Sequence, residues 1–331
     1  MRLKVQDRSD EIREGGARLR KVIASFEESS RLALERLSRV QARHRRAIFA
    51  FAFAVFTAGL ILSLRDLGIG LSDIRWRPAA VLAFVLVPCT IAYSAVNMML
   101  MAHAARVPMR FIDGVRVSVF AQVAEMLPVP GGAIVRTAAL NKAGAGLAKS
   151  LALILLFSFL WVALATLAAG AALWHLGWLP QSMTGVGLVA SFIVLACLGH
   201  SFGWIAGLGA VGLRLFGLAL VAFRIYCAFA VIGAIVQPAE TFLFVFASVI
   251  GSAASLVPAG LGVSETLSAF LAGLISFAPA AAFLAPALNR LIGLAMHLLV
   301  ALAFMLAGRL ETVEMRNGTS RAIGLQGDYR P

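Results

Sequence analysis

Charged side chains are scarce in this sequence of 331 residues. Asp, Glu, Lys and Arg make up 14% of the chain and hydrophobic residues 60%, whereas an average soluble domain is about 25% charged. The hydrophobic residues form long runs, and roughly 20 such residues in a row can cross a bilayer as a helix. The first run, residues 47–64, lacks the polar stripe of a helix on a soluble domain. The composition therefore excludes a soluble globular protein and predicts an all-α polytopic membrane protein.

Cysteine and histidine are also few, with three and five residues. Cys89, Cys197 and Cys227 all fall in apolar runs and form no CxxC pair, which excludes a disulfide framework. The histidines show no HxxxH or HxxE spacing, so we expect no metal site and no cofactor. Paired acid and base residues of a catalytic site and an ATP-binding motif are also missing, so we expect no catalytic residues and a protein that is not an enzyme.

Positive charge is abundant but unevenly placed. The formal net charge is +13, and residues 1–46 hold 13 of the 29 Lys and Arg. The others mostly flank apolar runs, as is typical of cytoplasmic loops at an anionic membrane surface, so we expect no nucleic-acid partner. Residues 1–46 are expected to form a basic amphipathic helix that lies on the membrane, pairs as a short coiled coil, or simply leads into the first span. Its apolar residues recur every seven positions: Ile12, Leu19, Phe26, Ala33 and Val40.

A membrane domain is expected over residues 47–308, followed by a cytoplasmic tail over 309–331. Stretch 204–216 is ambiguous and could hold a further short helix. The predicted crossings are 47–64, 79–102, 150–173, 186–203, 217–236 and 280–307.

The distribution of Lys and Arg predicts that both termini are cytoplasmic in a multi-pass protein of the inner membrane. The first apolar run begins only at Ala47, so we expect no cleavable signal peptide. The loops assigned to the inner side carry Arg106, Arg110, Lys142, Lys149, Arg214 and Arg309, against Arg65, Arg75 and Arg77 outside.

Two further apolar segments are interrupted by proline and glycine. Segment 111–143 is broken at 127–132, and segment 241–276 at 256–262. Such clusters remove backbone donors and favour non-helical dihedrals, which are tolerated at membrane depth only inside protein or beside water. We interpret both segments as re-entrant helical hairpins, with kinked spans as the alternative. On the predicted crossings the hairpins enter from opposite sides, as in an inverted repeat with a site at the midplane.

Ionisable residues inside spans are costly and often functional. Near each break a helix begins, and its N-terminal N–H groups can bind an anion. The alternative is structural, with Glu125 paired to Arg136 and Glu265 to Arg290 to hold the hairpins. The candidate lipid-binding residues are Glu125, Pro128, Gly131, Gly132, Arg136, Arg224, Pro258, Gly260, Gly262, Ser264, Glu265 and Arg290.

The two breaks resemble signatures of a known family. Residues 111–136, with Pro-Val-Pro-Gly-Gly-Ala-Ile-Val-Arg at their end, look like its first motif. Residues 258–265, Pro-Ala-Gly-Leu-Gly-Val-Ser-Glu, followed by Arg290, look like the second. The family is the membrane region of the lysylphosphatidylglycerol synthases, the flippase-like integral membrane proteins. The resemblance carries over Pro128, Gly132, Arg136, Pro258, Gly260, Gly262, Glu265 and Arg290 as motif positions.

This resemblance implies a protein that binds and translocates a polar lipid, of phospho- or isoprenoid type, between leaflets of the cytoplasmic membrane. The alternative is a non-catalytic subunit that presents a lipid intermediate to a partner biosynthetic enzyme. The expected partner is a membrane lipid with an anionic head group, and an oligomer is compatible with the sequence. The chain departs from the family in two ways. We expect no synthase domain after Gly308, and the span beginning at Ser150 lacks the acid–arginine pair that many relatives carry.

The charge distribution gives a topology prediction. Reporter proteins fused at Met1 and at Pro331 should both be located in the cytoplasm, so a fluorescent protein should fold there and alkaline phosphatase should stay inactive. A C-terminal phosphatase that is active only outside would contradict the six-crossing assignment.

Overall fold

The computed structural model describes residues 50–126, 131–253 and 260–325. The predicted N-terminal helix, Pro128 and Pro258 lie outside these residues. The described part consists of helices joined by short turns, and it contains no strand. Its helices belong to the compact unit Phe51–Pro331.

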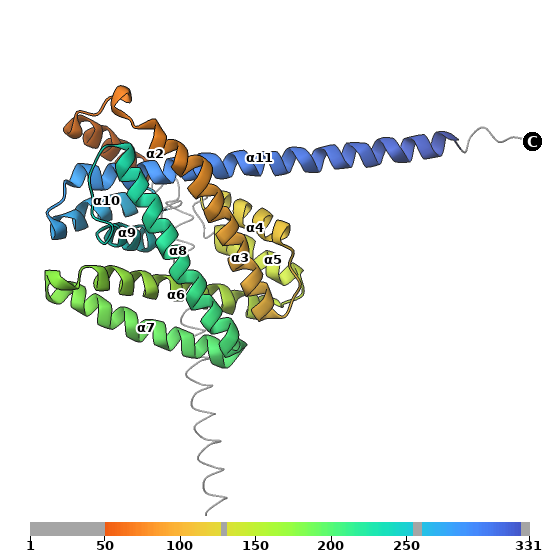
Figure 1. The fold of residues 1–331 in the computed structure, drawn as a ribbon. Coiled ribbons are helices and arrows are strands. Elements are labelled where there is room, and N and C mark those ends of the chain that lie inside the picture. Colours follow the sequence, from red (N-terminus) through yellow and green to blue (C-terminus); the bar gives the residue numbers. More distant parts are fainter. Residues whose placement is uncertain (1–49, 127–130, 254–259, 326–331) are drawn as a thin grey trace, which may run out of the picture. The chain divides into compact units, whose positions relative to one another are not determined.

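Within the described residues, six helices are long and apolar enough to cross a membrane, which confirms the all-α polytopic fold (Figure 1). The first is Ala50–Leu67. The second span consists of three consecutive helical elements. A π-helical turn lies in its middle, just before Pro88, whose nitrogen cannot donate a backbone hydrogen bond. Its parts are α2 (Trp76–Val81), η2 (Leu82–Leu86) and α3 (Val87–Ala105). The others are α6 (Leu147–Ala172), α7 (Trp178–Phe202), α8 (Trp204–Val231) and α11 (Pro279–Leu325), of which Pro279–Ala307 is the apolar part.

The predicted boundaries were wrong around residue 203. Stretch 204–216 is neither a loop nor an extra helix but the first half of α8, so the crossing predicted at 217–236 begins 13 residues earlier, at Trp204. The chain turns from α7 into α8 at a single residue, Gly203, whose φ of +96° suits glycine and is costly for other residues. Arg214, predicted in an inner loop, therefore lies within a spanning helix.

Both interrupted segments form pairs of short helices. The first pair is α4 (Phe111–Ala124) and α5 (Gly131–Lys142), and the second is α9 (Thr241–Ala253) and α10 (Val263–Leu271), which continues as η5 (Ala272–Ile275). At 1.5 Å per residue α4 is about 21 Å long and α9 about 20 Å, too short for a hydrocarbon core of about 30 Å. Within each pair the two helices pack against each other. They are helical hairpins, not kinked spans.

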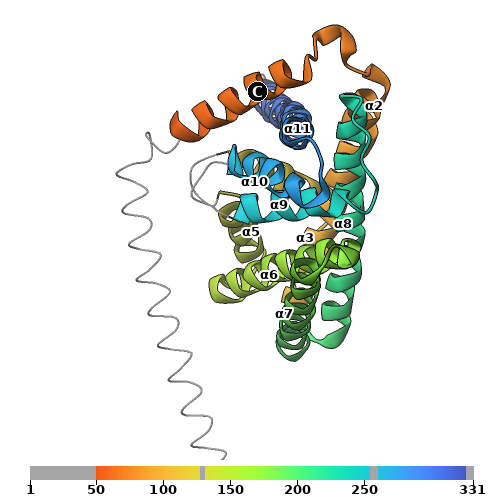
Figure 2. The same ribbon diagram turned by 90° about the vertical axis from the view of Figure 1, so that its left-hand side faces the viewer.

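The order of elements repeats within the chain. Two long helices, a hairpin and a long helix occur first as Ala50–Leu67, α2–α3, α4–α5 and α6, and again as α7, α8, α9–α10 and α11. The helix packing repeats in the same way: α4 contacts α11, and its counterpart α9 contacts α6. Each half has three spans, so the second half starts on the opposite side of the membrane and is inverted. In Figures 1 and 2 the hairpins flank α6 and α11, with α9–α10 and α4–α5 at opposite ends in Figure 1.

In both hairpins the two helices meet at a glycine, which starts α5 in the first hairpin and lies near the end of α9 in the second. A Cβ atom added to Gly131 would overlap the carbonyl oxygen of Ala124, and one added to Gly251 would overlap Ser264. Each glycine thus lets the two helices of its hairpin approach to backbone contact. Small residues have the same use wherever helices pack closely in membranes.

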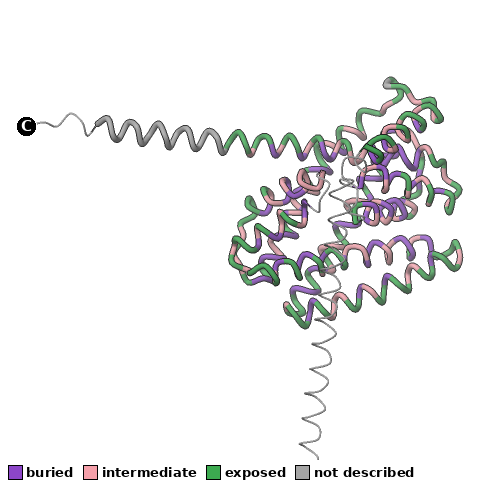
Figure 3. Tube along the Cα trace, turned by 180° about the vertical axis from the view of Figure 1, so that it is seen from behind, coloured by how far each residue is buried: buried purple, intermediate pink, exposed green. Residues whose placement is uncertain are grey.

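Large apolar side chains cover the outside of the spans. Phe84 and Phe192 are each 71% exposed and Ile205 is 87% exposed, and Figure 3 shows exposed residues along one face of most spans. A soluble protein would not expose so much apolar surface. These faces are suited to contact lipid tails.

The inverted repeat predicts how the hairpins are reached from water. In a background without the three native cysteines, Cys at Lys142, at the end of α5, should react with a membrane-impermeant maleimide only from the inside. Cys at Gln237, just before α9, should react only from the outside. If both react from one side, the second half is not inverted.

Candidate functional site

The second hairpin, α9–α10, places a carboxylate at the start of α10. Gly262, with φ of +79°, directs the chain into α10, and its N–H donates a hydrogen bond of 2.9 Å to Oε2 of Glu265. This is the acidic half of a capping box, which satisfies one of the free N–H groups at a helix start. Glu265 is fully buried, with an exposed fraction of 0%.

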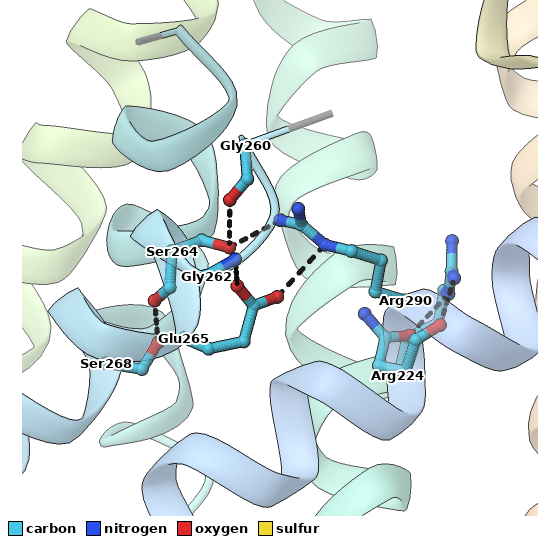
Figure 4. A network of polar contacts seen from close by, with 8 residues as sticks. Arg224, Gly260, Gly262, Ser264, Glu265, Ser268 and Arg290 are labelled. Carbon is cyan, nitrogen blue, oxygen red and sulfur yellow. Dashed lines mark hydrogen bonds and ion pairs between the residues drawn. The ribbon is translucent and has the colours of Figure 1, made fainter. Parts of the chain in front are cut away.

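Arg290 of α11 neutralises this carboxylate. Its Nε lies 3.1 Å from Oε1 of Glu265, and its Nη2 donates to the hydroxyl of Ser264. That hydroxyl also donates to the carbonyl of Gly260, 3.5 Å away. Figure 4 shows Arg290 reaching across to the break from the neighbouring helix. Arginine is suited to this position because its planar group offers donors to two partners at once.

The first hairpin, α4–α5, holds a second ion pair. Glu125 follows the last residue of α4, and its Oε1 lies 3.1 Å from Nη2 of Arg136 on α5. Its other oxygen accepts a hydrogen bond of 2.9 Å from Gln122. Gly132 leaves room for the carboxylate, because a Cβ atom there would overlap Oε1 of Glu125. Both expected pairs, Glu125–Arg136 and Glu265–Arg290, are therefore present.

The two ion pairs differ in exposure. The side chains of Arg136 and Glu125 are 28% and 30% exposed, whereas those of Arg290 and Glu265 are 14% and 0% exposed. The Glu125–Arg136 pair can thus be reached by a small ligand, whereas the Glu265–Arg290 pair is closed.

Arg224 has a mainly structural setting. It is buried in α8 and donates from Nε to the side-chain oxygen of Asn289, 3.1 Å away, and from Nη1 to the hydroxyl of Thr90, 3.2 Å away. Its Nη2 lies 3.4 Å from the backbone oxygen of Asn289. These bonds join α8, α3 and α11 next to the Glu265–Arg290 pair (Figure 4). All three acceptors are uncharged.

Arg214 is the residue that the sequence interpretation missed. On α8, its guanidinium lies 5.7 Å from the ring centre of Phe157 and 5.1 Å from that of Trp161, and it donates a hydrogen bond of 3.4 Å to the hydroxyl of Tyr93. These distances are those of cation–π contacts. The signal in the sequence was that Arg214, like Arg224, lies within an apolar run that extends from 204 to 236.

The structure gathers most predicted residues into two groups, one at each hairpin. His297 of α11 is buried, and its Nδ1 lies 2.7 Å from the backbone oxygen of Gly293. Gly131 serves helix packing, and Pro128 and Pro258 lie outside the described residues. Within the described chain no three His, Cys, Asp or Glu side chains are placed to hold a metal ion.

Comparison of the chain with family models, with curated proteins and with solved structures finds no match.

The different exposures of the two ion pairs predict that loss of their glutamates destabilises the protein to different extents. Glu265→Gln should lower the free energy of unfolding by about 3–5 kcal/mol, because it leaves Arg290 buried without a counter-charge. Glu125→Gln should cost about 1 kcal/mol or less, because solvent screens a partly exposed pair. Denaturant unfolding of the purified protein in detergent would measure both.

A double variant provides the control. Glu265→Gln combined with Arg290→Gln should recover much of the loss, since no unpaired charge remains. Equal losses for Glu265→Gln and Glu125→Gln would contradict the difference in burial.

Proposed function

We propose that this protein binds the anionic head group of a polar lipid and moves it between the leaflets of the cytoplasmic membrane while the tails remain in the bilayer. The observation that carries the proposal is the placement of one Glu–Arg ion pair at each of two hairpins that belong to opposite halves of an inverted repeat. Repeats of this kind commonly hold the substrate between them and expose it to each side in turn. The resemblance of the two breaks to flippase-like membrane proteins supports the same function.

The chemistry of the ion pairs fits an exchange of anions. Arginine binds a carboxylate and a phosphate through the same pair of donors, so a head-group phosphate can replace Glu125 at Arg136. Glu265 already occupies the start of α10, where its carboxylate accepts the Gly262 N–H. It holds the position in which a bound anion would meet both a helix N-terminus and an arginine. Each glutamate carboxylate thus occupies the position at its arginine that the phosphate of the substrate would take.

Transport requires the two pairs to alternate. In the present state the pair on the proposed inner side, Glu125–Arg136, is partly exposed, and the pair on the proposed outer side, Glu265–Arg290, is buried. When the head group reaches the outer hairpin, Glu265 releases Arg290 and the inner pair closes again. We propose no covalent step. Movement is downhill or coupled to an ion gradient, and both termini remain in the cytoplasm.

The arginines should be essential for transport. Arg136→Ala and Arg290→Ala should abolish translocation of fluorescent anionic lipids in reconstituted vesicles, as measured by chemical quenching of the outer leaflet. Arg136→Lys should also be impaired, because an ammonium cannot copy the planar two-pronged donor. Arg110→Ala, at an exposed position before α4, removes a positive charge outside the site and should leave transport unchanged.

A charge-neutral variant separates binding from stability. If the outer pair only stabilises the fold, Glu265→Gln with Arg290→Gln should remain stable and active. Activity in this double variant would refute the role of Arg290 in binding phosphate. A stable but inactive protein is the outcome that the proposal requires.

A further inference from the structure

The central ionisable side chains carry an excess of positive charge. The two hairpin ion pairs neutralise Arg136 and Arg290. Among the described residues, the hydrogen bonds and ring contacts of Arg214 and Arg224 involve only uncharged groups: Tyr93, Phe157, Trp161, Thr90 and Asn289. Two positive charges inside spanning helices therefore have no carboxylate beside them. Charges at membrane depth are costly unless an anion compensates them.

Arg214 and Arg224 use their donors differently. Arg224 donates from all three of its nitrogens to fixed acceptors, so it contributes charge but few free N–H groups. Arg214 is held mainly by ring faces, which attract the cation without accepting hydrogen bonds in the plane of the guanidinium. Its buried Nε finds no acceptor in the described part of the chain. A buried charged donor without an acceptor is expensive, which indicates a position prepared for a ligand.

Arg136 completes this position. It lies on α5, which packs against α6, the helix whose Phe157 and Trp161 contact Arg214. Its side chain is partly exposed, as is that of its present partner, Glu125. An anion with several oxygens could accept from both arginines, as clustered arginines do when they bind phosphate.

We infer that the preferred head group is a phosphate monoester or diphosphate on a lipid, and that Arg214 together with Arg136 recognises its second negative charge. This inference rests on the proposed function and names the substrate class of the same site. A phosphate monoester carries about −1.5 to −2 charges at neutral pH, enough to replace Glu125 at Arg136 and to balance Arg214 as well, whereas a phosphodiester carries only about one. A zwitterionic head group, or one bearing an added amine, would increase the local excess of positive charge and be disfavoured.

The test compares lipids that share the same fluorescent tails. A phosphate monoester, a phosphatidylglycerol and a phosphatidylethanolamine are placed in vesicles with the purified protein, and translocation is followed by quenching of the outer leaflet. The monoester should move at least about tenfold faster than the diester, the effect expected for one or two charge-assisted hydrogen bonds. Arg214→Gln should reduce the monoester to the rate of the diester, while Arg110→Gln should preserve the preference.

A second measurement needs no variant. The second proton of a phosphate monoester binds near pH 6. Lowering the pH from about 7.5 to about 5.5 should therefore remove most of the preference for the monoester. The diester serves as the internal control, because protonation of the protein's own groups, such as Glu125 or His297, acts on both lipids.

The outcomes distinguish the inference from the proposed function. Equal rates for monoester and diester in the wild type, with Arg136→Ala still inactive, would overturn the inference and leave lipid transport standing. A preference that survives Arg214→Gln, or that persists at low pH, would also overturn it. No movement of any lipid would sink the proposed function itself. Uptake of inorganic phosphate into the vesicles without lipid movement would show that the anion comes from solution.

Discussion

Inside a bilayer, every backbone N–H and C=O group must find its partner within the protein. A helix broken at membrane depth violates this rule unless other groups fill the gap, and the two hairpins show how this chain does so. At the break in the second hairpin, the carboxylate of Glu265 accepts a hydrogen bond from the N–H of Gly262, and the hydroxyl of Ser264 donates one to the carbonyl of Gly260. A buried carboxylate then needs a counter-charge, which Arg290 supplies from α11. The need to complete the backbone thus brings charge into the membrane and fixes where it lies.

Because each arginine is neutralised by an ion pair, its anionic partner can be exchanged for another anion. An ion pair in a protein of low polarity is stable only while both members are present, so an arginine released by its glutamate must be met by another anion. A head-group phosphate meets that requirement and a neutral molecule does not. In the function that we propose, the pairs couple binding of the head group to the arrangement of the hairpins. Their different exposures show that the two ends of the site need not open together.

Arg214 shows a second way to hold a cation among spanning helices. Aromatic rings stabilise it and leave much of its hydrogen-bonding capacity unused. Gly217, one turn further along α8, gives Tyr93 the room it needs, since a Cβ atom there would overlap the Tyr93 ring. Packing and charge at this point are therefore set by the same pair of helices, α3 and α8.

The sequence by itself determined the fold class, the number of spans and the existence of both hairpins. Long apolar runs and Pro-Gly interruptions are local signals, and each reflects what a segment does with its own backbone in lipid. The pairing of Glu125 with Arg136 and of Glu265 with Arg290 could be expected, because each pair lies close to a break. Only the tertiary structure decided that Arg214 faces Tyr93 and Trp161, that α7 turns into α8 at Gly203, and that one ion pair is exposed and the other closed. Most of these features depend on which helices become neighbours, and a contact such as that between Tyr93 and Arg214, 121 positions apart, leaves no periodic mark in a single sequence.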